Sequence, residues 1–152
     1  MGAPSLKSKL NQLFADVDKL NALHEGSIGG HLGIEITAIG EDHVAGKMPV
    51  DERTRQPHGI MHGGASIVLA ETLGSIASYL LVWGVEGARV AGVEVSGSHL
   101  RAVSSGNVYG LCKAVHIGRT LHFWQIDIRD DDERLCCAAK LTVSVSLPTG
   151  SG

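Results

Sequence analysis

The run from residue 58 to residue 80, HGIMHGGASIVLAETLGSIASYL, limits the fold of this chain more than any other feature, because so apolar a segment must be buried. Residues 65–83 number about 19, which is near the lower limit for crossing a bilayer. However, Glu71, Gly74 and several serines interrupt the run, and no cluster of lysine or arginine flanks it. Segments with the pattern of strands lie on both sides and can cover such a helix. We therefore predict a buried core helix over residues 63–82.

Six segments around this helix alternate apolar and polar residues with a period of two, which is typical of strands with one buried face. They span residues 33–40, 43–50, 90–103, 108–117, 121–130 and 134–147. Short turns between several of them predict antiparallel neighbours. The simplest packing is an α+β domain, in which a curved antiparallel sheet of about six strands wraps round one long central helix. A second subunit would cover an open edge of this sheet.

The beginning of the chain has a different pattern. Apolar residues recur there at helical spacing, namely Leu6, Leu10, Leu13, Val17 and Leu20. We predict an N-terminal helical extension over residues 1–26, the sheet domain over 27–147 and a tail over 148–152. The stretch HEGSIGGHLG, residues 24–33, is predicted to be a loop because its glycines interrupt any period. No apolar signal segment opens the chain, so a cytoplasmic location is expected.

Charge and cysteine content exclude several classes of function. The formal net charge is -3 and no basic stripe is present, which argues against nucleic acid as the main partner. Cys112, Cys136 and Cys137 are too few and wrongly spaced for a disulfide framework or a zinc cluster, so they are expected to be buried thiols. His58 and His62 are four residues apart, but the proline and glycine beside them would break a shared helix. We therefore predict no metal site.

Glu71 is the unusual residue of the predicted core helix, because a buried carboxylate is costly unless it is paired or neutralised. Only Ser75, one turn further on, can share its face as a polar partner. Glu71 therefore either belongs to a structural network or takes part in chemistry. The helix begins at His-Gly-Gly, where free backbone N–H groups favour a developing oxyanion, and Gln56 adds an amide donor nearby. This arrangement suits acyl transfer, provided that the acid and the donors come from neighbouring helices of a dimer.

The segment QPHGIMHGGASIVLAETLGS resembles the signature of hotdog-fold acyl-CoA thioesterases of the PaaI-like group. The likeness extends over residues 27–147 and includes MPVDERTRQP, GVEVSGSHLRAV and GLCKAVHIGRTLHFWQIDIRD. It implies the hotdog fold, a homodimer or dimer of dimers, and no cofactor other than the coenzyme A of the substrate. The nearest likeness within the group implies an aroyl-CoA substrate, of the 1,4-dihydroxy-2-naphthoyl-CoA or benzoyl-CoA type, and a place in menaquinone biosynthesis.

The resemblance also assigns catalytic roles by position. Glu71 would be the catalytic carboxylate, as nucleophile or general base. The backbone N–H of Gly63 and the side chain of Gln56 would polarise the thioester carbonyl. His62 would orient the thioester and Ser75 would help to place the attacking water. In such enzymes Glu71 comes from one subunit and residues 56–63 come from the other.

Coenzyme A binding is implied at two further segments and at one glycine. The matching positions are Gly92, His99, Leu100, Arg101, Ala102, His116, Ile117, Gly118, Arg119, Thr120 and Leu121. Two of them, Arg101 and Arg119, suit phosphates, and the turn at Gly118 offers backbone N–H groups. The chain departs from the family pattern at DDDERL, residues 130–135, where a glycine is usual in the tight turn.

Three alternatives stay open at this stage. One is a thioesterase for medium-chain or long-chain fatty acyl-CoA, since relatives with nearly the same motifs accept such esters. Another is a hotdog dehydratase or hydratase, which also carries an acid on its central helix but pairs it with a differently placed histidine. The third is a non-catalytic acyl-CoA sensor, although such sensors normally carry a DNA-binding segment. The His-Gly-Gly opening of the helix favours the thioesterase.

Overall fold

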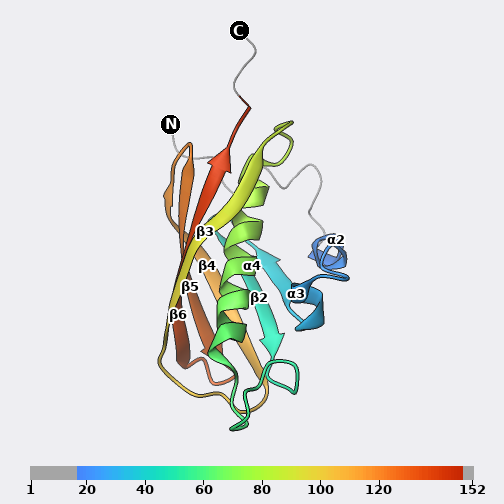
Figure 1. Cartoon of the computed structure of the whole chain (residues 1–152), viewed down its shortest axis with the longest axis vertical. Coiled ribbons are helices and arrows are strands. Elements are labelled where there is room, and N and C mark those ends of the chain that lie inside the picture. Colours follow the sequence, from blue (N-terminus) through green and yellow to red (C-terminus); the bar gives the residue numbers. More distant parts are fainter. Residues whose placement is uncertain (1–16, 149–152) are drawn as a thin grey trace.

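The computed structural model describes residues 17–148, which form one antiparallel sheet and one long helix (Figure 1). The elements in chain order are α2 (Val17–Ala22), α3 (Ile28–His31), β1 (Glu35–Ile39), β2 (His43–Pro49), α4 (Gly63–Val82), β3 (Arg89–His99), β4 (Asn107–Ile117), β5 (Leu121–Asp130) and β6 (Leu135–Ser146). The six strands are ordered β1-β2-β4-β5-β6-β3, and every neighbouring pair is antiparallel. The predicted α+β architecture is confirmed.

Helix α4 packs along one face of the sheet and contacts strands β2 to β6 (Figure 1). It is long and apolar enough to span a bilayer, but 61% of its most apolar window is buried inside the molecule. The inward side chains of β2, β5 and β6 alternate as predicted, and Trp124, Ile126 and Ile128 of β5 are all buried. Strand β3 has no buried residue. Trp124 keeps its indole N–H satisfied by donating to the Ser78 hydroxyl of α4 at 2.8 Å. The helix and the sheet therefore bury each other's apolar faces.

The predicted loop over residues 24–33 is wrong in part, because α3 forms within it. Ser27 caps this short helix, and its hydroxyl accepts a hydrogen bond from the N–H of Gly30. A side chain at position 30 would collide with the carbonyl of His24, so the glycine permits the tight turn that precedes the helix. Of the predicted N-terminal helix, residues 1–16 lie outside the described residues, and α2 forms its last part.

Strand β3 forms one edge of the sheet and pairs with β6 alone. It ends at His99, earlier than the predicted residue 103, and residues 100–106 form a loop to β4. Val93 lies at a bulge in this strand and is 58% exposed. Apart from this bulge and the charges of Arg89 and Glu94, the strand carries no feature that would protect its free edge against pairing with another strand. This edge is where the predicted second subunit would be expected.

Candidate active site

The first turn of α4 presents free hydrogen-bond donors. His62 is the N-cap residue, and its Nδ1 accepts a hydrogen bond from the N–H of Gly64 at 2.8 Å. Since Nδ1 accepts, the ring proton of neutral His62 lies on Nε2, which can then donate. The N–H of Gly63 has no hydrogen-bond partner among residues 17–148. A helix N-terminus with such a free N–H attracts negative charge.

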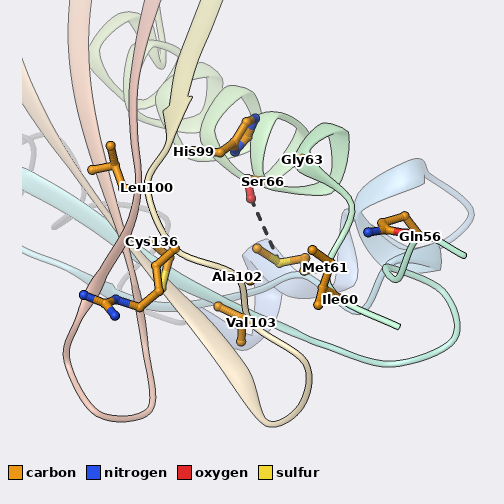
Figure 2. A pocket seen from close by; sticks show the side chains of 11 residues that line it. Gln56, Ile60, Met61, Gly63, Ser66, His99, Leu100, Ala102, Val103 and Cys136 are labelled. Carbon is orange, nitrogen blue, oxygen red and sulfur yellow. Dashed lines mark hydrogen bonds between the residues drawn. The ribbon is translucent and has the colours of Figure 1, made fainter. Parts of the chain in front are cut away.

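Gln56 adds a second donor beside this helix end. Its side-chain oxygen accepts a hydrogen bond from the N–H of His58. Its backbone N–H donates to the carbonyl of Ile60 at 2.8 Å. Because the side-chain oxygen is occupied, the NH₂ group is the end left to contact a ligand. Figure 2 shows that nitrogen turned toward the other labelled residues of the pocket.

A pocket of about 380 Å³ opens between this helix end and the loop after β3 (Figure 2). It brings together six of the residues predicted from the sequence, namely Gln56, Gly63, His99, Leu100, Arg101 and Ala102. Its remaining walls, which the sequence did not single out, are Ile60, Met61, Ser66, Val103 and Cys136. These walls are mostly apolar, so in the sequence they look like any other core residues. The pocket can therefore hold an apolar group beside two polar donors.

His99 explains why position 63 is a glycine. A Cβ atom at this position would lie 2.7 Å from Nε2 of His99, closer than such atoms approach in proteins. The imidazole therefore lies directly against the first residue of α4. His99, which the resemblance assigned to coenzyme A binding, is in this structure a neighbour of Gly63, whose N–H is free.

The Cys136 thiol on the pocket wall is not poised as a nucleophile. Burial raises its pKa, and the nearby Asp130 carboxylate raises it further. A thiol with a raised pKa stays protonated near neutral pH and is a weak nucleophile. Among residues 17–148, no group of three or more histidine, cysteine or acidic side chains is placed to hold a metal ion.

Glu71 lies elsewhere on α4. Eight residues separate it from Gly63, which corresponds to about 12 Å along a helix, and it does not line the pocket. It is partly buried, and its Oε1 lies so close to β3 that a Cβ atom at Gly92 would be 2.6 Å away. No residue in the described range 17–148 forms a hydrogen bond or ion pair with the carboxylate, and this includes Ser75. The structure gives Glu71 no place in a structural hydrogen-bond network.

The predicted coenzyme A segment His116–Leu121 lies far from the pocket within the chain. It forms the hairpin between β4 and β5, closed by a hydrogen bond from the N–H of Gly118 to the carbonyl of Leu121 at 2.8 Å. Figure 1 places this hairpin at the end of the sheet opposite the first turn of α4. A single chain therefore does not bring the two predicted coenzyme A segments together.

Comparisons with known proteins agree on the kind of enzyme. The sequence model of the Thioesterase superfamily matches residues 58–137. Over 129 residues the chain is 45% identical to 1,4-dihydroxy-2-naphthoyl-CoA hydrolase of Escherichia coli K12, covering 85% of this chain and 93% of that one. It is 49% identical to the proofreading thioesterase EntH of Cronobacter turicensis, with the same coverage. A crystal structure of a Haemophilus influenzae thioesterase superposes with a TM-score of 0.83 at 45% identity, covering 90% of this chain and 95% of that chain.

Proposed function

Because this chain belongs to the thioesterase superfamily and is a thioester hydrolase of the hotdog fold, we propose that it cleaves an aroyl-CoA ester with Glu71 as the catalytic carboxylate. The products would be the free aromatic acid and coenzyme A. The observation that carries the proposal is the composition of α4, which has free donors at its first turn and an unpaired carboxylate in its middle.

The chemistry assigns a role to each group. The thioester carbonyl oxygen would accept hydrogen bonds from the N–H of Gly63 and the side-chain NH₂ of Gln56, which stabilise the oxyanion as it forms. Glu71 would remove a proton from water as the oxygen attacks the carbonyl carbon, or would attack the carbon itself and form an anhydride that water then cleaves. Collapse of the tetrahedral intermediate would break the carbon–sulfur bond and release coenzyme A. One water is consumed in either case.

Distance supports a site shared by two subunits. If Glu71 attacks the carbonyl carbon itself, its carboxylate and the donors must lie within roughly 8 Å of each other, because the oxygen lies about 3 Å from its donors and the carbon about 3.5 Å from the acid. A water between the acid and the carbon extends this limit to roughly 10 Å. Within one chain the separation along α4 is about 12 Å. The acid would therefore come from one subunit and the donors from the other, with the free edge of β3 at the interface between them. The same dimer would bring His99–Ala102 of one subunit toward the opposite end of the partner, where His116–Leu121 lies.

The aroyl group is proposed from the pocket and the relatives together. Ile60, Met61 and Val103 give the pocket apolar walls that suit an aromatic ring. The Escherichia coli relative is named for 1,4-dihydroxy-2-naphthoyl-CoA, which would place this enzyme in menaquinone synthesis. Arg101 at the pocket and Arg119 in the distant hairpin are the cations proposed to contact the phosphates of coenzyme A.

The test is a substrate panel with thiol release as the readout. Aroyl-CoA and fatty acyl-CoA esters are compared by kcat/KM, and we expect 1,4-dihydroxy-2-naphthoyl-CoA or benzoyl-CoA to rank first. A preference for long-chain acyl esters would reject the aroyl assignment, and the absence of thiol release would favour a dehydratase. Glu71→Gln should lower kcat by about 10³-fold or more with KM little changed. Near-normal turnover in this variant would remove Glu71 from the mechanism.

A further inference from the structure

The segment that carries Gln56, residues 50–62, contains no helix and none of the six strands, yet hydrogen bonds hold it in a compact shape. Its two arms pair through a single bridge between Arg55 and Met61. The N–H of His62, the cap of α4, donates to the carbonyl of Thr54 at 2.7 Å. These bonds fix the segment internally, but they do not attach it to the opposite wall of the pocket.

Arg55 supplies such an attachment. Its Nε donates to the carbonyl of Ser104 at 3.1 Å, and one of its terminal nitrogens donates to the carbonyl of Val50 at 3.3 Å. Ser104 directly follows the loop residues that form the far wall of the pocket, including Ala102 and Val103. One guanidinium, next in sequence to Gln56, therefore joins the donor side of the pocket to the wall that faces it.

Backbone contacts support this connection at other points. The N–H of Met61 donates to the carbonyl of Val103 at 2.7 Å. At the start of the segment, the N–H of Val50 donates to the carbonyl of Gly106 at 2.9 Å, so the loop and the segment meet at three places. The planar guanidinium can bind two carbonyls in different directions at the same time, whereas the ammonium of lysine is a point charge on a flexible stem. The side chain of Arg55 is exposed, so solvent screens its charge. Its effect on the pocket therefore depends on the directions of its two hydrogen bonds.

We propose that Arg55 is a positioning residue for thioester hydrolysis, which holds Gln56 and the first turn of α4 at the correct distance from the loop at residues 100–104. This inference rests on the proposed roles of Gln56 and Gly63. Displacement of a catalytic group by about 1 Å can lower a rate by about 100-fold. Loss of Arg55 would loosen this connection only in part, because the backbone bonds Met61–Val103 and Val50–Gly106 remain. It should therefore lower kcat by about 10-fold and leave KM within about threefold.

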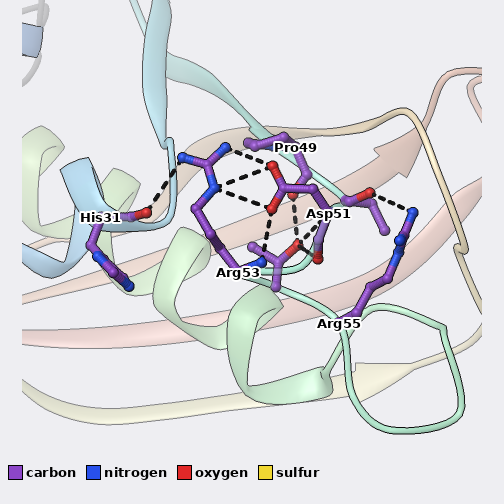
Figure 3. A network of polar contacts seen from close by, with 7 residues as sticks. His31, Pro49, Asp51, Arg53 and Arg55 are labelled. Atoms are coloured by element: carbon purple, nitrogen blue, oxygen red, sulfur yellow. Dashed lines mark hydrogen bonds and ion pairs between the residues drawn. The ribbon is translucent and has the colours of Figure 1, made fainter.

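Arg53 provides a matched control on the same segment. Its guanidinium binds the Asp51 carboxylate at 2.6 Å and reaches the carbonyl of His31 at 3.4 Å. Figure 3 shows Arg53 turned toward Asp51 and His31, while Arg55 extends away from them. Arg53→Met removes the same charge from the same segment without touching the loop that walls the pocket. Its kcat should stay within about twofold of the wild type.

The experiment compares Arg55→Met, Arg55→Lys and Arg53→Met by kcat, KM and hydrogen exchange. Arg55→Met should lose about 10-fold in kcat, and Arg55→Lys should recover only part of it because one ammonium cannot hold both carbonyls. Exchange should quicken in residues 56–63 and 100–104 of Arg55→Met but not of Arg53→Met. Full recovery of kcat in Arg55→Lys would show that a positive charge suffices, against the proposed role of the guanidinium geometry. Equal losses of kcat in Arg55→Met and Arg53→Met would show that the effect is not specific to Arg55.

Two results would overturn the inference, namely unchanged kcat or unchanged exchange in Arg55→Met. The exchange measurement keeps this test separate from the proposed function. A wild-type protein that releases no thiol from any ester would refute the proposed function. The coupling of the two pocket walls through Arg55 would still be decided by exchange.

Discussion

Replacing Gly92 with alanine should impair catalysis by moving Glu71, without contact with the substrate. The new methyl group would lie 2.6 Å from Oε1 of Glu71, whereas ordinary van der Waals contact begins near 3.4 Å. The carboxylate would therefore have to withdraw by about 0.8 Å, and its position at the end of a flexible side chain allows it to do so. A displacement of this size should lower kcat by roughly 10-fold to 100-fold. Stability should change by less than about 1 kcal/mol, because alanine is tolerated in an edge strand.

Gly97→Ala is the matched control, since it adds the same methyl group to the same strand. There the new atom would lie 2.7 Å from Cδ1 of Ile67 and away from the carboxylate. Overpacking of this kind should cost about 1–3 kcal/mol of stability but leave kcat near the wild-type value. Thiol release under saturating substrate gives kcat, and thermal unfolding gives stability. If Gly92→Ala raises KM and leaves kcat unchanged, Gly92 contacts coenzyme A, and the account of Glu71 positioning is wrong.

Two further predictions concern the hairpin between β5 and β6. Glu133 has a φ of 60°, a backbone conformation that glycine adopts more easily than other residues. Glu133→Gly should therefore raise the free energy of unfolding, measured by chemical denaturation, by about 0.5–1 kcal/mol. A lower free energy of unfolding would refute this. Burial raises the pKa of Asp130, but hydrogen bonds from Arg134 outweigh it and hold the pKa below its ordinary value. A carboxylate whose pKa is lower in the folded state than in the unfolded state stabilises the fold at pH values above its unfolded pKa. This stabilisation is lost as the pH falls through the folded-state pKa. Arg134→Gln should therefore move the acid-unfolding midpoint, followed by circular dichroism, to higher pH; an unchanged midpoint would contradict the role of Arg134.

Much of the fold follows from local pattern in the sequence. The core helix has the bounds predicted, and most strands agree closely because one buried face imposes a period of two on each of them. Strand β3 has no buried residue in this chain, and its predicted end was four residues too late. The short helix α3 was missed because a single capping serine, Ser27, forms it among glycines that disfavour helices. The pairing of β3 with β6 was also not predictable, since periodicity describes the faces of a strand but not which distant strand lies beside it.

Part of the candidate site could likewise be predicted from the sequence, and part of it only the structure gives. Gln56 and Gly63 could be found from the sequence because the His-Gly-Gly opening of the helix offers free backbone N–H groups and Gln56 adds an amide donor just before it. Their closeness to His99 depends on where β3 ends, which only the three-dimensional structure gives. The attachment made by Arg55 depends on the backbone carbonyls of Val50 and Ser104, whose positions leave no trace in the sequence.

Subunit complementation tests whether one α4 helix serves two active sites, with its first turn in one and Glu71 in the other. Glu71→Gln removes the acid, and Gly63→Ala disturbs the donor end by colliding with His99. When the two inactive proteins are unfolded together and refolded as a mixture, half of the dimers should be mixed, and each of these should contain one intact site of two. A site shared by two subunits should therefore recover about a quarter of wild-type thioesterase activity. Activity no greater than that of the separate variants, with mixed dimers demonstrated by mass spectrometry, would show that acid and donors act within one subunit.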